Sequence, residues 1–208
     1  MPRRMTIAVV FALTLSGCAT MNSEECALSD WHAVGYEDGA KGLQSERFGD
    51  YRKDCAKHGV VPDFQAYLAG RDEGLVEFCR PERGFRLGEN GRAYNGVCDA
   101  ALEAPFLDAY RVGKQLHTLR LRLSETRSRI ASHENRIEDN AELIDEKEAA
   151  LIAEDTTTEQ RVLLLADLKR LAEEQGELRA EIDQLISEQA YREAELNDYE
   201  STLTGYRY

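Results

Sequence analysis

Apolar residues recur every seven positions through much of the C-terminal half of the chain. The first series runs from Leu116 to Leu151 by way of Leu123, Ile130, Ile137 and Ile144. A second series alternates steps of four and three residues, and its members are Leu164, Leu168, Leu171, Gln175, Leu178, Ile182, Leu185, Gln189, Arg192, Leu196, Tyr199 and Leu203. Both spacings keep side chains on one edge of a helix that packs along another helix. We therefore predict a coiled-coil helical arm over residues 114–205.

A break near residues 153–158 divides this arm. It lies in the stretch AEDTTTEQ, where Thr156 and Glu159 have the spacing of a capping box that starts a new helix. Residues 114–136 hold six basic and two acidic residues, and a fold about residue 155 lays them against 174–196, where acidic residues predominate. Opposite charges on neighbouring edges favour an antiparallel hairpin with helices of about 40 residues, roughly 60 Å long. An extended or oligomeric rod is the alternative.

The companion positions of the first series are polar, which makes this half of the arm a weak coiled coil by itself. These positions are Thr126, His133, Asn140 and Lys147. They leave room for a third helix or a partner protein, and the oligomeric state stays open.

Residues 27–113 have a different pattern, in which glycines take the helical spacing that apolar residues usually occupy. The stretch GYEDGAKG (35–42) and the stretch GFRLGENG (84–91) share their glycine spacing, and GRDEG (70–74) repeats its first half. We expect helices at about 30–45, 47–57, 63–78 and from 104 onward, with Asp30 and Asp63 as N-caps. The stretch RPERGF reads as a turn, because Pro81 resists a helix interior.

A glycine in a helix interior costs about 1 kcal/mol relative to alanine, so this glycine stripe needs a reason. Close packing of a second helix or an aromatic ring is one reason, a surface cleared for a ligand such as a glycan strand is another, and simple turns are a third. The candidate surface comprises Trp31, Gly35, Asp38, Gly39, Tyr67, Gly70, Gly74, Gly88, Gly91 and Tyr94.

Four cysteines accompany the glycines, and they are evenly scattered and lack the C-x-x-C spacing of zinc sites. In a secreted chain, an even number of this kind indicates disulfides, for which three pairings are possible. The sequential pairing, Cys26–Cys55 and Cys79–Cys98, closes the shortest loops and is the one we expect.

These residues carry a family resemblance. The motif W-x3-G-x2-DG-x2-G begins at Trp31, Y-x2-GR-x2-GL-x2-FC begins at Tyr67, and G-x3-G-x2-G-x2-Y-x-GVC begins at Gly84. From residue 26 to about 117 the chain resembles a proteobacterial lipoprotein family known as domain of unknown function twenty-seven ninety-nine. The resemblance implies a lipoprotein setting and brings no activity or catalytic residue with it.

The N-terminus indicates where the protein goes. Arg3 and Arg4 precede a short apolar run, and Leu15-Ser16-Gly17-Cys18 resembles a bacterial lipobox. We expect residues 1–17 to be a signal peptide, Cys18 to carry covalent lipid, and residues 18–26 to form the lipidated tether. Because Ala19 stands where aspartate tends to mark inner-membrane retention, we expect a Gram-negative outer-membrane lipoprotein that faces the periplasm.

The net charge and the absence of known motifs exclude several classes of function. The formal charge is −13, and removal of the two arginines with the signal peptide makes it −15, which argues against binding nucleic acid. No metal-ligand spacing, nucleophile motif or phosphate-binding loop is present in the sequence. We therefore expect no catalytic residues, no metal and no cofactor beyond the lipid.

The sequence as a whole predicts a mainly α protein with a small disulfide-stapled, glycine-rich helical domain (27–113) and a long helical hairpin or coiled-coil arm. We expect a non-catalytic envelope scaffold or adaptor whose arm binds another envelope protein. The alternative is a module that binds peptidoglycan or another envelope ligand through the glycine and aromatic surface, and an enzyme comes third.

Overall fold

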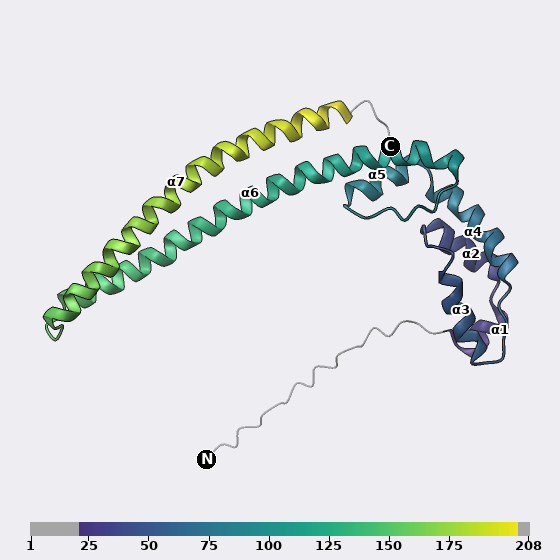
Figure 1. The fold of residues 1–208 in the computed structure, drawn as a ribbon, viewed down its shortest axis with the longest axis horizontal. Coiled ribbons are helices and arrows are strands. Elements are labelled where there is room, and N and C mark those ends of the chain that lie inside the picture. The colour runs from purple at the N-terminus through teal and green to yellow at the C-terminus, as the bar shows by residue number, and fades with distance from the viewer. Residues whose placement is uncertain (1–20, 204–208) are drawn as a thin grey trace, which may run out of the picture. The chain divides into compact units, whose positions relative to one another are not determined.

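The structure is a computed structural model that describes residues 21–203, and Cys18 with the rest of the lipobox lies outside the described residues. The helices are α1 (Ser23–Leu28), α2 (Trp31–Ala40), α3 (Arg47–Ala56), α4 (Phe64–Phe78), α5 (Pro81–Glu89), α6 (Ala100–Ile152) and α7 (Thr158–Leu203) (Figure 1). Residues 21–203 contain no strand. The predicted mainly helical class, with two disulfides and a long arm, is confirmed.

The chain divides into two compact units. The first takes in the described residues up to Cys79 together with Asn95–Leu102, and the second takes in Arg80–Tyr94 and the described residues from Glu103 onward. Helix α6 runs without interruption through Gly113, the point at which the composition of the sequence changes.

In the first unit, aromatic side chains from three helices form the core. Trp31 of α2, Phe48 of α3 and Tyr67 of α4 are buried together, with ring centroids of Trp31 and Phe48 6.1 Å apart and those of Phe48 and Tyr67 4.9 Å apart. The expected caps are present, since Asp30 and Asp63 each accept hydrogen bonds from two backbone N–H groups at the start of α2 and α4. These caps satisfy donors that a helix leaves unpaired.

Two disulfides fasten this unit, and their pairing is the sequential one. Cys26 of α1 is bonded to Cys55 of α3, and Cys79 at the end of α4 is bonded to Cys98. All of these cysteines are buried. In a small domain with little apolar core, each bridge stabilises the fold by roughly 2–4 kcal/mol.

The prediction of a turn in the stretch RPERGF was wrong, because this stretch starts helix α5. Pro81 is the first residue of α5, and Arg80 before it has extended backbone angles. Proline fits the first helical position because the N–H that it lacks would have no partner there and its φ is already helical. The short helix α1, which the sequence analysis did not predict, starts with a capping box between Asn22 and Glu25.

Helices α6 and α7 lie side by side and antiparallel within the second unit (Figure 1). Every position of the two predicted apolar series is buried or half-buried. Ion pairs connect the helices at Arg120–Glu200 (2.9 Å), Arg127–Glu193 (2.6 Å), Arg136–Glu174 (2.5 Å) and Lys147–Asp167 (2.7 Å). The arm is therefore a hairpin, and the charge pattern read from the sequence gives its direction.

The capping box at the start of α7 lies one residue later than predicted. The backbone N–H of Gln160 donates to Thr157 Oγ1 (3.2 Å), and the backbone N–H of Thr157 donates to Gln160 Oε1 (2.8 Å). Thr156 instead donates its hydroxyl to the backbone oxygen of Ala150 at the end of α6 (2.6 Å). Both threonines thus fix the connection between the two long helices.

Candidate functional site

The glycines predicted to form a surface lie inside the contact between α2 and α4. A methyl group on Gly35 or Gly39 would overlap a backbone oxygen of α4, and one on Gly70 or Gly74 would overlap a backbone oxygen of α2. The two backbones therefore approach more closely than any side chain would allow. Close helix packing explains these four glycines, and the turn account holds at Gly91 and Gly96, whose φ angles of 69° and 67° are left-handed.

Helices α5 and α6 pack in the same way within the second unit. Gly84 and Gly88 of α5 lie against backbone oxygens of α6, and Gly113 of α6 lies against backbone atoms of α5. The glycine that follows each first helix has a left-handed backbone, with φ of 70° at Gly42 and 69° at Gly91. The repeated glycine spacing in the sequence thus produces the same helix pair twice, once in each unit.

Asp38 is a buried carboxylate that holds three helices together. It is 4% exposed and lies on α2. Its oxygens accept hydrogen bonds from the hydroxyl of Tyr67 on α4 (2.9 Å) and the hydroxyl of Tyr51 on α3 (3.1 Å). A buried carboxylate without such donors would cost several kcal/mol, so the two tyrosines stabilise its position.

The electrostatics of this cluster oppose proton transfer by the tyrosines. Burial, followed by the hydrogen bond to Asp38, raises the pKa of Tyr67 well above its ordinary value. Burial also raises the pKa of Tyr51. Both hydroxyls therefore stay protonated and keep donating to the carboxylate. Arg71, also buried, donates from Nε and Nη2 to the backbone oxygen of Leu43 (3.1 and 2.8 Å) and holds the loop after α2.

The last two residues of the predicted surface lie in the second unit, apart from the Asp38 cluster in the first. Tyr94 donates its hydroxyl to Glu103 (3.0 Å), and its ring lies 4.8 Å from that of Phe106 between centroids. Gly91 lies beside the ring of His117, where a methyl group would not fit.

The predicted binding surface is therefore not an open face of the protein. Trp31, Asp38 and Tyr67 are buried, as are the glycines of α2, α4 and α5 in the predicted set. Physically, the glycines bring backbones together and the aromatic rings fill the core beside them. Of the predicted set, Gly91 is exposed and Tyr94 is half-buried. Within residues 21–203, no cluster of three or more His, Cys, Asp or Glu side chains is arranged to hold a metal ion.

In the middle of the arm, polar side chains lie in the contact between α6 and α7. Asn140 is 6% exposed, and its side-chain nitrogen has no hydrogen-bond partner in the described part of the chain. Gln175 donates to the backbone oxygen of Ile137 (3.2 Å), and His133 Nε2 lies 3.1 Å from a carboxylate oxygen of Glu181. These groups set the register of the hairpin but contribute little apolar burial.

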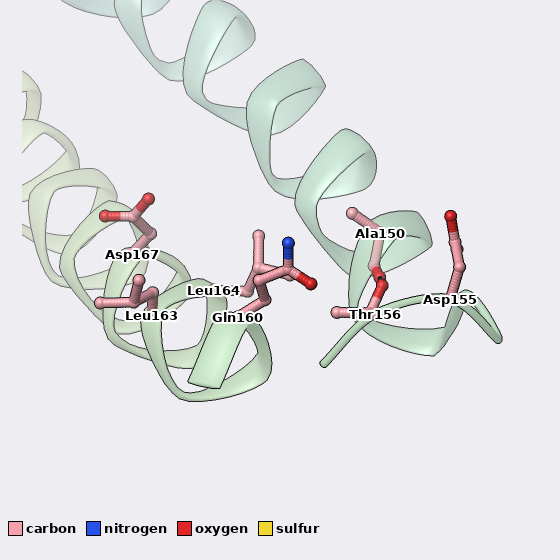
Figure 2. Close-up of a pocket in the computed structure, with 7 residues that line it drawn as sticks. All are labelled: Ala150, Asp155, Thr156, Gln160, Leu163, Leu164 and Asp167. Atoms are coloured by element: carbon pink, nitrogen blue, oxygen red, sulfur yellow. Dashed lines mark hydrogen bonds between the residues drawn. The ribbon is translucent and has the colours of Figure 1, made fainter. Parts of the chain in front are cut away.

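The free end of the hairpin has the opposite character, and we call residues 142–168 the arm tip. Five large aliphatic side chains are exposed there: Ile152 (80%), Leu163 (68%), Val162 (62%), Leu165 (55%) and Leu143 (43%). Ile152 and Leu165 line an open groove of about 620 Å³. Leu163 lines a second hollow of about 370 Å³, whose walls come from α7 and from the end of α6 with its loop (Figure 2).

Arg161 connects the start of α7 to the end of α6 and to the loop between them. Its guanidinium donates to the backbone oxygens of Leu151, Ala153 (2.9 Å) and Thr156 (3.2 Å). The carbonyl groups at the end of a helix carry a partial negative charge, so an arginine at this place is favourable. The loop between α6 and α7 is thereby tied to the first turn of α7.

Comparison with known proteins identifies part of the chain. Residues 30–115 match the model of the family described as "Protein of unknown function (DUF2799)". This segment matches the DUF2799 family. The resemblance drawn from the glycine, aromatic and cysteine motifs is confirmed. No curated protein and no solved structure matches the chain.

The DUF2799 segment contains both glycine-packed helix pairs and the Asp38 cluster, so its characteristic residues serve packing in this structure. The arm beyond residue 115 lies outside the match. Among the described residues, no helix combines the length and the apolar character needed to cross a membrane.

The exposed residues of the arm tip were not among the candidate site residues predicted from the sequence. The run VLLLADL (162–168) could have indicated them, because it holds more aliphatic residues than the face of one helix can bury against another. Only Leu164 and Leu168 of this run belong to the predicted series, and both are half-buried in the hairpin. The surplus is what makes the arm tip the best candidate for a binding site.

Proposed function

We propose that the protein is a non-catalytic lipoprotein of the bacterial envelope that acts as a scaffold or adaptor through its helical arm. One observation carries this proposal: the arm is a hairpin closed by ion pairs between its own two helices, yet it exposes several aliphatic side chains at its free end. Clusters of this kind on soluble surfaces commonly mark binding sites for other proteins.

The anchor in this proposal is lipid on Cys18, preceded by the lipobox residues Leu15, Ser16 and Gly17. Several acyl chains on one residue hold a protein firmly, since each buried methylene contributes about 0.8 kcal/mol. With Ala19 after the cysteine, the proposed location is the periplasmic face of the outer membrane. Labelling of native cells with a palmitate analogue tests this part: the chain should be labelled, and a Cys18→Ser variant should not.

The adaptor role is tested by photocrosslinking in intact cells. Photoreactive residues placed singly at exposed positions between 120 and 200 should capture one discrete envelope protein from several positions. If every crosslink joins α6 to α7 of the same chain, the arm has no partner and the adaptor proposal fails.

A further inference from the structure

The arm tip presents apolar surface that the hairpin does not use. Helix α7 turns Leu164 and Leu168 towards α6 and leaves Val162, Leu163 and Leu165 outside. The outer face of a helix in a soluble protein is ordinarily polar. At the end of α6, Ile152 adds a fourth side chain, which is 80% exposed.

The rest of the arm offers a contrast on the same two helices. There, large exposed aliphatic side chains such as Leu121 (47%) and Ile186 (53%) stand on different helices and far from the loop. Single exposed aliphatic residues are normal on protein surfaces, whereas several around one loop, lining two neighbouring hollows, are not. Leu121 and Ile186 therefore serve as matched controls for the cluster at the arm tip.

The charge around this cluster has one sign. Residues 142–168 contain eight acidic and two basic residues, a net charge of −6. Seven of the acidic side chains are exposed: Glu142, Asp145, Glu146, Glu148, Glu154, Asp155 and Glu159. Asp145 and Glu148 line the groove of Ile152 and Leu165, and Asp155 lines the hollow of Leu163, so the field at both hollows attracts cationic groups.

Both basic residues of the arm tip are occupied within the hairpin. Lys147 Nζ lies 2.7 Å from Asp167 on α7, and Arg161 donates to backbone oxygens of the loop. Neither is placed to meet an acidic group on a partner. The next cations along α7, Lys169 and Arg170, are 3.6 and 3.5 Å from glutamates on their own helix.

We infer that the arm tip binds an aliphatic helical segment of another protein that carries lysine or arginine beside its apolar face. This inference rests on the adaptor function proposed above and adds the place and the chemistry of the contact. Aliphatic side chains supply the burial, and charge complementarity selects and orients the partner. Because Arg161 and the capping box already fix the loop, little ordering is required on binding.

Other occupants fit the charge less well. A second copy of the chain would bring the same net charge of −6 against the arm tip, and like charges in contact are unfavourable. An anionic lipid surface would be repelled for the same reason. Crosslinking at the arm tip detects a second copy.

The first test uses two synthetic probes with the full chain. Both are amphipathic helical peptides of about 18 residues, roughly five turns, with the same leucine face. One carries lysines beside that face and the other carries glutamates. Fluorescence anisotropy should show at least about tenfold tighter binding of the lysine peptide, and the preference should shrink as salt rises from about 0.1 M to about 1 M.

Variants locate the contact. The change Ile152→Ser, Leu163→Ser and Leu165→Ser should weaken binding of the lysine peptide by at least about tenfold, because hot spots of interfaces lie in their apolar centre. The matched control, Leu121→Ser with Ile186→Ser, should leave binding unchanged. All of these residues are at least 47% exposed, so the hairpin should fold in both variants.

A parallel measurement in cells separates the possible outcomes. A crosslinker at Leu163 should attach to a partner segment that mass spectrometry shows to be aliphatic and flanked by lysine or arginine. Equal binding of the two peptides, equal effects of the two variants, or capture of a second copy of this chain at Leu163 would overturn the inference. A partner captured only from the positions of Leu121 and Ile186 would overturn it and leave the adaptor function standing. No partner at any position would remove both.

Discussion

Replacement of Gly39 by alanine tests the glycine packing at one of the points where the backbones of α2 and α4 meet. The added methyl group would overlap the backbone oxygen of Arg71, and it would lie 2.9 Å from the carbonyl carbon of Arg71 and 3.0 Å from the backbone nitrogen of Leu75. Because all of these are backbone atoms, α2 and α4 must separate by about 1 Å, which forfeits a quarter to a half of the dispersion energy of their contact.

The expected loss is about 2 kcal/mol or more in the free energy of unfolding of the first unit. Overpacking at a site that cannot yield costs about 3 kcal/mol, and the better helix propensity of alanine offsets about 1 kcal/mol. Trp31 is the only tryptophan of the chain and is buried in this unit, so its fluorescence reports unfolding there. A loss of about 2 kcal/mol lowers the urea midpoint by about 1 M.

The matched control is Gly49→Ala in α3. A methyl group at Gly49 would meet nothing within 4 Å, so only helix propensity changes and stability should rise by up to about 1 kcal/mol. The two alanines thus have opposite expected signs in the same unit and the same assay. If Gly39→Ala stabilised the protein as Gly49→Ala does, the account of the glycine stripe as a close backbone contact would be wrong.

Three further predictions follow from contacts in the two units. Tyr67→Phe leaves the buried carboxylate of Asp38 with one fewer donor and should cost about 1–3 kcal/mol by Trp31 fluorescence; a cost near zero would mean that the hydrogen bond is not needed. Replacement of the Cys26–Cys55 bridge by serines should cost roughly 2–4 kcal/mol in the same urea titration, and an unchanged midpoint would contradict its stabilising role. The hydrogen bond from Lys147 lowers the pKa of Asp167 from its ordinary 3.8. The ion pair therefore contributes its full stabilisation of the folded state above about pH 4, and this stabilisation is lost as the pH falls through the lowered pKa. An NMR titration of the carboxyl carbon should show Lys147→Met returning that pKa towards 3.8, and no change would exclude the pair as the cause.

The arm was the most predictable part of the fold because the regular spacing of its apolar residues can be read from the sequence. Leu116, Leu123 and Leu185, taken from the two apolar series, are all buried in the structure. The charges of residues 114–136 gave the antiparallel direction, because long side chains on facing edges can meet only in one arrangement. The start of α7 was off by one residue, since Thr156 and Thr157 offer equivalent hydroxyls and only the tertiary position of Ala150 assigns the first to α6.

The glycine domain was less predictable because glycine spacing does not reveal what lies against it. A stripe such as Gly35, Gly39 and Gly42 is compatible with a helix contact or a ligand, and only the path of α4 decides between them. The turn predicted at Pro81 was wrong for a related reason. Proline breaks a helix in its interior but fits its first position, and the sequence does not show which of these positions Pro81 takes.

The exposed aliphatic residues of the arm tip were hidden in a different way. In the sequence, Val162 and Leu163 look like further residues of the contact between the two long helices, beside Leu164. Which of several adjacent aliphatic residues faces the neighbouring helix depends on the register set by polar contacts such as Lys147–Asp167. The candidate binding site therefore became visible only with the hairpin assembled.

The measurement that tests the central claim most directly compares two photocrosslinking positions in intact cells, Leu163 at the arm tip and Ile186 away from it. Both side chains are exposed on the same helix, so both probes sample the same compartment. An adaptor that binds its partner at the arm tip predicts one discrete envelope protein crosslinked from Leu163 and little or none from Ile186. Self-crosslinks alone, or the same diffuse background from both positions, would contradict it.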